Sequence, residues 1–152
     1  MVTLNRLALA LAARSPFLAR LTVHLVARWL RRHPGHYLAC MMATAPPADR
    51  RVLADPSYRA LVTESTAEAL RQGGRGAAWE LTLLAQPWDF KLQEVLVPVR
   101  IWQGLADNIV PAATAQHLAA ALPNSECHYL PDEGHLSPVV RHLDAVLADL
   151  RV

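Results

Sequence analysis

The sequence has few cysteines and lysines and no long apolar run. Its two cysteines, Cys40 and Cys127, are too few for a disulfide framework, so we expect two small, buried thiols in a reducing compartment. A membrane-spanning helix needs about 18 apolar residues in succession, and no run reaches that length. These absences argue against a disulfide-stapled scaffold and a membrane-spanning protein, and they lead us to expect a cytoplasmic one.

Acidic residues are absent from positions 1–48, although the whole chain has a formal charge of only +2. That segment carries six arginines, which are Arg6, Arg14, Arg20, Arg28, Arg31 and Arg32. Because the total charge is small, we expect no nucleic-acid partner. The apolar stretch after Arg6 resembles a secretory signal, and the acid-free start resembles a transit peptide. We interpret both as helical faces with solvated arginines.

Hydrophobic residues make up 53% of the 152 residues and charged residues 18%, which is typical of one globular domain with a sizeable core. Positions 1–86 read as helices separated by proline and glycine. The predicted helices are 4–14, 17–32, 37–45, one that begins after Asp55, and 77–85. Ser15 and Asp55 are predicted N-caps, each followed by a proline in the first turn. An apolar stripe on the second helix consists of Phe17, Leu18, Leu21, Leu25 and Trp29.

The pattern changes after Pro87 from helices alone to alternating strands and helices. Residues 97–102 are β-branched and aromatic and are followed by Gly104, which predicts a strand. A helix over 111–122, a strand over 126–130 and a final helix over 137–150 follow. We therefore expect an α/β fold, with a helical region over 1–86 and two parallel strands joined by a right-handed crossover within 87–152, the two regions forming one structural unit. The inner face predicted for the final helix is Val139, Val140, Leu143, Val146 and Leu147.

Two residues with catalytic chemistry follow the two predicted strands. Asp107 comes shortly after Gly104, and His135 comes directly after Gly134, 28 residues beyond Asp107. The carboxyl ends of parallel strands lie at one sheet edge, where open α/β sheets place their sites. A carboxylate there can accept the ring N–H of a histidine and set its tautomer. Each residue alone could be an ordinary loop residue, with Asp107 making a turn, but the spacing predicts that the two meet.

The segment 98–111, PVRIWQGLADNIVP, resembles the acid-bearing segment of the α/β-hydrolase family. The segment 122–135, from Leu-Pro-Asn to Glu-Gly-His, is similar to the histidine segment of the same family. The likeness covers about 86–150, and the helical residues before it resemble the family's lid only loosely. It implies that Asp107 is the triad acid and His135 the triad base, in an enzyme that hydrolyses an ester or another small apolar substrate. It implies no metal and no organic cofactor.

The nucleophile of that family is missing from the sequence. The family carries it in a Gly-x-Ser-x-Gly turn ahead of the lid, and no such motif occurs. The serines are Ser15, Ser57, Ser65, Ser125 and Ser137, of which Ser137 reads as an N-cap. Two parallel strands make a poor sheet, so we also expect exposed apolar surface. The sequence therefore corresponds to the lid and rear portion of a hydrolase, truncated or degenerate or paired with another chain, and inactive alone.

Trp88-Asp89-Phe90 joins the two predicted regions. Trp88 is a candidate substrate-binding residue, with a packing anchor as the alternative. Asp89 is expected to cap a short turn over 90–95. A second set of side chains could line an apolar pocket or pack in the core, namely Met41, Met42 and Trp79.

The leading hypothesis is a hydrolase portion that carries an acid and a histidine. Its expected partners are a small-molecule substrate once the site is complete, and a partner chain or a second copy of this chain, with neither nucleic acid nor a membrane surface. A second hypothesis is a non-catalytic module whose acid-free helices over 1–32 dock on a partner protein or an anionic membrane. A third is one half of a split enzyme. The charge asymmetry discriminates between the first two, because an enzyme lid does not require it.

Overall fold

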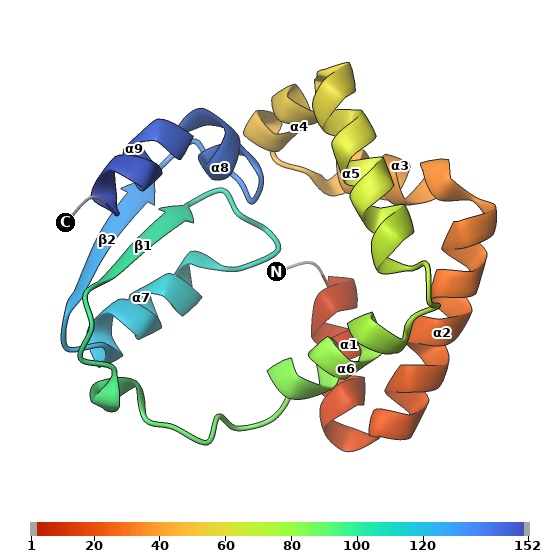
Figure 1. The fold of residues 1–152 in the computed structure, drawn as a ribbon, viewed down its shortest axis with the longest axis horizontal. Helices are drawn as coiled ribbons and strands as arrows, with labels where there is room; N and C mark the ends of the chain where they lie inside the picture. Colours follow the sequence, from red (N-terminus) through yellow and green to blue (C-terminus); the bar gives the residue numbers. More distant parts are fainter. Residues whose placement is uncertain (1–2, 151–152) are drawn as a thin grey trace. The chain divides into compact units, whose positions relative to one another are not determined.

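The computed structural model describes residues 3–150, which are mostly helical and include a two-stranded parallel sheet (Figure 1). In chain order the elements are α1 (Thr3–Arg14), α2 (Pro16–Arg32), α3 (Pro34–Thr44), α4 (Pro47–Ala54), α5 (Pro56–Ala69), α6 (Arg75–Leu84), η1 (Leu92–Glu94), β1 (Val99–Gly104), α7 (Ala112–Ala121), β2 (Ser125–Leu130), α8 (Ser137–Arg141) and α9 (Leu143–Asp149). No described helix is both long and apolar enough to cross a membrane.

The described residues divide into two compact units. The helical unit comprises 3–44 and 53–87, and the α/β unit comprises 45–52 and 88–150. The short stretch 45–52 includes most of α4, and it belongs with the sheet although it lies between helical segments of the chain. The sheet and the two catalytic candidates therefore receive residues from a part of the chain that the sequence pattern assigned to the helical region.

Small residues bring the helices of the helical unit together. Ala12 of α1, Ala19 and Ala27 of α2, and Ala78 of α6 are each at most 2% exposed. Gly74, at the start of α6, lies so close to α2 that a Cβ atom there would be 2.8 Å from the carbonyl oxygen of Val23. The helices of this unit thus approach one another closely through small residues, and Leu53 is a fully buried large side chain of the same unit.

The apolar stripe of α2 is exposed. Phe17 is 74% exposed, Leu25 56% and Trp29 46%, whereas the buried residues of α2 are alanines. Exposed apolar side chains occur in both units, including Leu84 in the helical unit and Leu96 in the α/β unit. This agrees with the exposed apolar surface expected from the composition.

The N-termini of two helices, α2 and α5, lie where the capping residues predicted them. The Ser15 hydroxyl accepts a hydrogen bond from Leu18 N at 3.4 Å, and Asp55 Oδ1 accepts one from Ser57 N at 2.7 Å, so both predicted N-caps are confirmed. The third helix begins at Pro34, three residues earlier than predicted, because proline is favourable in a first helical turn. The helix α4 was not predicted.

Strands β1 and β2 run parallel, as predicted from the strand–helix–strand order. Their register pairs Val99 with Ser125 and Gly104 with Leu130, and α7 packs against both strands. The predicted final helix is instead two helices, α8 and α9, which meet at His142. Its predicted inner face is also wrong in part, because Val139 is 62% exposed. Leu143 and Leu147 are exposed as well.

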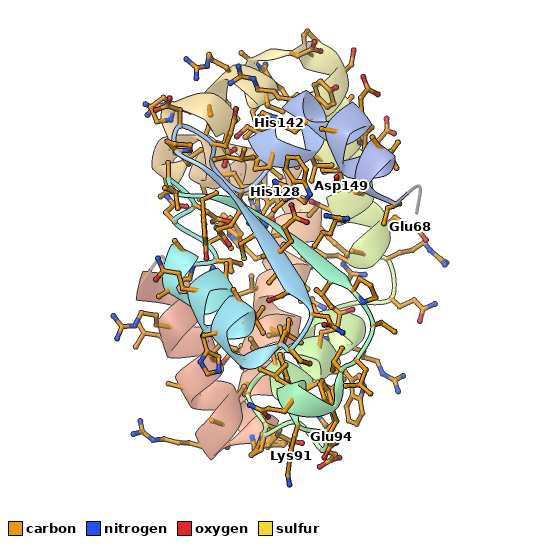
Figure 2. All side chains as sticks on the ribbon, turned by 90° about the vertical axis from the view of Figure 1, so that its left-hand side faces the viewer. Glu68, Lys91, Glu94, His128, His142 and Asp149 are labelled. Atoms are coloured by element: carbon orange, nitrogen blue, oxygen red, sulfur yellow. The ribbon has the colours of Figure 1, made fainter. Side chains whose placement is uncertain are left out.

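An aromatic and acidic cluster, of which Figure 2 labels His128 and Asp149, ties α9 to the sheet. The indole of Trp102 stacks on the ring of His128 with centroids 4.3 Å apart. Trp102 Nε1 donates to Asp149 Oδ2 at 3.2 Å, and His128 Nε2 lies 3.4 Å from the same oxygen. These contacts join β1, β2 and α9, so α9 is held beside the strands.

Two smaller predictions are wrong. Cys40 is an exposed free thiol and Cys127 is half-buried, so neither is the buried small group expected. Asp89 does not cap the short turn that follows it. That turn is η1, where Lys91 holds the N-cap position and its backbone N–H donates to Glu94 Oε2 at 3.5 Å.

Candidate functional site

Asp107 lies in the loop that follows β1 and uses both of its carboxylate oxygens. Oδ1 accepts hydrogen bonds from Ile109 N at 2.7 Å and Val110 N at 2.9 Å. Oδ2 lies 2.8 Å from His135 Nδ1. Asp107 therefore has both of the roles expected for it. Oδ1 stabilises the turn, and Oδ2 pairs with the histidine.

The side chain of Gln103 holds the loop that carries Asp107 through two hydrogen bonds. This side chain is 7% exposed, and its Nε2 donates to Gly104 O at 2.7 Å and to Val110 O at 3.2 Å. The same loop is held to the next one by Ala106 N, which donates to Glu133 O at 3.0 Å. The backbone around Asp107 is therefore held by hydrogen bonds to Gln103 and to the loop of Glu133. The side chain of Asp107 is only 6% exposed.

His135 follows β2, and its ring meets the carboxylate of Asp107. The ring is 37% exposed, in contrast to its nearly buried partner. With the proton on Nδ1, the ring donates to Asp107 Oδ2 and leaves Nε2 as the acceptor nitrogen. A histidine held in this way can take a proton from a neighbouring hydroxyl, thiol or water through Nε2.

The backbone of the His135 loop is bound by an aspartate that is distant in sequence. Asp49, in the first turn of α4, is 3% exposed and accepts hydrogen bonds from the backbone N–H groups of three consecutive residues, which are His135, Leu136 and Ser137. Gly134 comes so near that a Cβ atom on it would overlap the carboxylate of Asp49. Ser137 was predicted to cap the helix it begins, but it is the first residue of α8, and Asp49 satisfies the N–H groups there instead.

Glu133 forms a second buried acidic centre in the same loop. It is 5% exposed, and its Oε1 lies 2.9 Å from a guanidinium nitrogen of Arg141 and 3.2 Å from His142 Nε2. Burial raises the pKa of Glu133, but the side chains of Ser137, His142 and Arg141 outweigh it, so the pKa lies below its ordinary value of 4.5. The carboxylate is therefore charged at neutral pH and holds α8 to the loop.

The lowered pKa of Glu133 predicts a loss of stability in acid. A depressed folded-state pKa contributes stability that is complete above the ordinary value of 4.5 and is lost as the pH falls through the lower folded value. We expect Glu133→Gln to be less stable than the wild type at pH 7, and the difference to shrink between pH 4.5 and pH 3. Thermal unfolding midpoints across that range measure it, with Glu64→Gln on the exposed face of α5 as the matched control. An unchanged difference at pH 3 would contradict the assignment.

The serines of the α/β unit do not pair with His135. Ser137 is fully buried, and its hydroxyl accepts a hydrogen bond from Gly134 N at 2.9 Å. The hydroxyl of Ser125 donates to Ala119 O at 3.0 Å. Ser15, Ser57 and Ser65 belong to the helical unit. Among the described residues of the α/β unit, no serine is thus hydrogen-bonded to the histidine as a nucleophile would be.

Trp88 is placed at the start of the α/β segment after Pro87. It is 53% exposed and stacks on Phe90 with ring centroids 5.4 Å apart. No described contact joins it to Asp107 or His135, so its substrate-binding role stays a prediction. Trp79, by contrast, lines a hollow of about 890 Å³ within the helical unit, together with Phe17 and Arg20.

Within residues 3–150, no group of three or more His, Cys, Asp or Glu side chains is arranged to hold a metal ion. His33 and His36 instead pack around Trp29, with ring centroids 5.0 Å and 4.9 Å from the indole.

Asp49 and Glu133 are the two site residues that sequence reasoning missed. The sequence shows Glu133 only as part of the motif before His135, because its burial depends on α8. The one local signal for Asp49 is an acidic residue in the first turn of a helix that begins with proline. Nothing in the sequence connects position 49 with position 135.

Comparison with known proteins gives little beyond this geometry. No protein-family model and no curated protein matches the chain. A crystal structure described as a non-heme bromoperoxidase, BpoC, from Mycobacterium tuberculosis H37Rv is similar over 88% of this chain, with 21% sequence identity and a TM-score of 0.49. The chain spans about half, 51%, of the length of that protein. The comparisons assign the chain to no family.

Proposed function

We propose that Asp107 and His135 are the acid and base of a hydrolase of the α/β-hydrolase type, whose nucleophile lies outside these 152 residues. The observation that carries the proposal is the 2.8 Å contact between Asp107 Oδ2 and His135 Nδ1 at the carboxyl ends of two parallel strands. The predicted lid and partial hydrolase fold belong to the same proposal. The substrate class is an ester or another small, mostly apolar electrophile.

Each residue has a distinct role in this proposed scheme. His135 Nε2 takes the proton of the nucleophile as that group attacks the substrate, and the imidazolium then returns it to the leaving group. In the second half-reaction Nε2 takes a proton from water, which attacks the covalent intermediate. The bond to the nucleophile then breaks, and the imidazolium returns the proton to the nucleophile. Asp107 Oδ2 holds the ring through Nδ1–H and stabilises the imidazolium, while the bonds from Ile109 N and Val110 N keep the carboxylate in place.

The chain alone lacks the group that would attack a substrate. Ser137 and Ser125 are occupied by bonds to backbone groups, and the Gly-x-Ser-x-Gly turn that would carry a nucleophilic serine is absent from the sequence. A longer polypeptide or a second chain would supply the nucleophile together with the backbone N–H groups of an oxyanion hole.

Ester hydrolysis and active-site labelling test the proposal. We expect the purified 152-residue chain to be unlabelled by a fluorophosphonate and to hydrolyse p-nitrophenyl acetate no faster than its His135→Gln variant. The native protein, captured from its source cells through a C-terminal tag, should hydrolyse the ester and should have either a greater mass or a co-purifying chain.

Two outcomes would contradict this function. One is labelling of a serine within these 152 residues that disappears when that serine is replaced by alanine. The other is a native protein of the same mass, without a second chain, that has no hydrolytic activity.

A further inference from the structure

We propose that Asp49 is a positioning residue for His135, an inference that rests on the proposed role of His135 as the base. Asp49 is a buried carboxylate on α4, and 86 residues separate it from His135 in the sequence. It contacts neither the histidine ring nor Asp107 through any described hydrogen bond, so it acts on the ring through the backbone that carries it. The first turn of α4 and the start of α8 lie next to each other in Figure 1.

The two oxygens of Asp49 have different partners. Oδ1 accepts from Leu136 N at 3.0 Å and from Ser137 N at 2.9 Å, which are N–H groups at the start of α8. Oδ2 accepts from His135 N at 2.8 Å. A charged acceptor makes stronger hydrogen bonds than a neutral one, and it is favourable beside N–H groups that have no partner in the helix. One oxygen therefore anchors α8, and the other anchors His135 itself.

Two carboxylates from distant parts of the sequence therefore hold His135, one through its backbone and one through its ring. Asp49 fixes its backbone nitrogen, and Asp107 fixes its ring nitrogen. Gly134 makes the first contact achievable, because any side chain on it would overlap Asp49 and Pro46. A histidine base works only while its ring stays within hydrogen-bond reach of both partners, so a small shift of its backbone would separate Nδ1 from Oδ2.

Asp49→Asn separates this positioning role from a role limited to α8. The asparagine amide retains one oxygen, which can still accept from Leu136 N and Ser137 N. Its NH₂ group then faces His135 N–H, and two donors cannot bond each other. If the asparagine amide is flipped, its oxygen faces His135 N, and the bonds from Leu136 N and Ser137 N are lost instead. The first orientation keeps more hydrogen bonds, so the variant removes the contact to His135 in particular.

Nuclear magnetic resonance at neutral pH measures both effects in the 152-residue chain. We expect amide exchange at His135 to be at least about tenfold faster in Asp49→Asn, since tenfold corresponds to 1.4 kcal/mol of lost protection, while Leu136 and Ser137 stay protected. We also expect the low-field Nδ1–H resonance of His135 to be lost. Asp55→Asn is the matched control, because asparagine caps a helix as well as aspartate does.

The outcomes separate this inference from the proposed function. If the Nδ1–H resonance persists in Asp49→Asn, Asp49 does not position the ring, and the acid–base pair stands without it. If Asp49→Asn does not fold, Asp49→Ser offers a single neutral acceptor at the same place, and persistence of the resonance in that variant would equally overturn the inference. If the wild type itself shows no Nδ1–H resonance bonded to Asp107, the pair fails and the role of Asp49 fails with it.

Discussion

Asp107→Asn is expected to reverse the tautomer of His135 and, in the complete enzyme, to lower kcat by about 10⁴-fold. The asparagine oxygen can replace Oδ1 and keep the bonds from Ile109 N and Val110 N. Its NH₂ group then takes the place of Oδ2 and donates to His135 Nδ1, which must become the acceptor. The proton moves to Nε2, so the nitrogen that should receive a proton from the nucleophile already carries one.

The tautomer change can be measured without activity. The ¹⁵N shifts of the two ring nitrogens distinguish a ring protonated at Nδ1 from one protonated at Nε2, and the reversal should be complete at neutral pH. Asp132→Asn, at an exposed position of the same loop region as His135, is the matched control and should leave the ring unchanged. Retention of the Nδ1–H tautomer in Asp107→Asn would show that Asp107 does not set it.

Gly104→Ala is expected to lower the free energy of unfolding by about 3 kcal/mol, at the upper end of the usual cost of overpacking. A Cβ atom at Gly104 would overlap the carbonyl oxygens of Glu133 and Gly134 and would lie 2.7 Å from the carbonyl carbon of Glu133. All three are backbone atoms, so no side-chain rotation can relieve the contact. The loops that carry Asp107 and His135 would have to move apart.

Urea denaturation followed by circular dichroism measures this loss. The matched control is Gly76→Ala, because a Cβ atom at Gly76 meets nothing within 4 Å. Gly76 lies in α6, where alanine should be more stable than glycine by about 0.5–1 kcal/mol. Equal stability of Gly104→Ala and the wild type would mean that the two loops are farther apart than in this structure.

The parts of the fold that the sequence predicted depend on local chemistry. Ser15 and Asp55 cap helices because their side chains reach the N–H groups just after them, and the proline next to each favours the first turn. The break between α8 and α9 and the exposure of Val139 had no local signal. Burial of these apolar positions depends on which other segments cover them, and periodicity alone does not contain that information.

In the candidate site, too, the contacts that follow from the order of strands and loops were predicted, and those with a segment distant in sequence were not. The order of strands and loops predicted that Asp107 and His135 would emerge at one sheet edge, because parallel strands end together, and the structure places them in hydrogen-bond contact. Asp49 was missed because its bonds go to backbone N–H groups, which every residue except proline carries. When a side chain binds backbone groups, its partner can be almost any residue type. The sequence around the partner therefore gives no sign of the contact.

The assignment of residues 45–52 to the α/β unit has a consequence for how the chain can be divided. Within residues 3–150 the polypeptide passes between the two units near residues 44, 52 and 87. A single cut near Pro87 would leave residues 45–52 on the N-terminal fragment, so only non-covalent contacts, among them the bonds of Asp49 to the loop after β2, would join them to the rest of the α/β unit. An attempt to express the α/β unit as 88–152 alone would therefore omit the carboxylate that binds the backbone of its histidine.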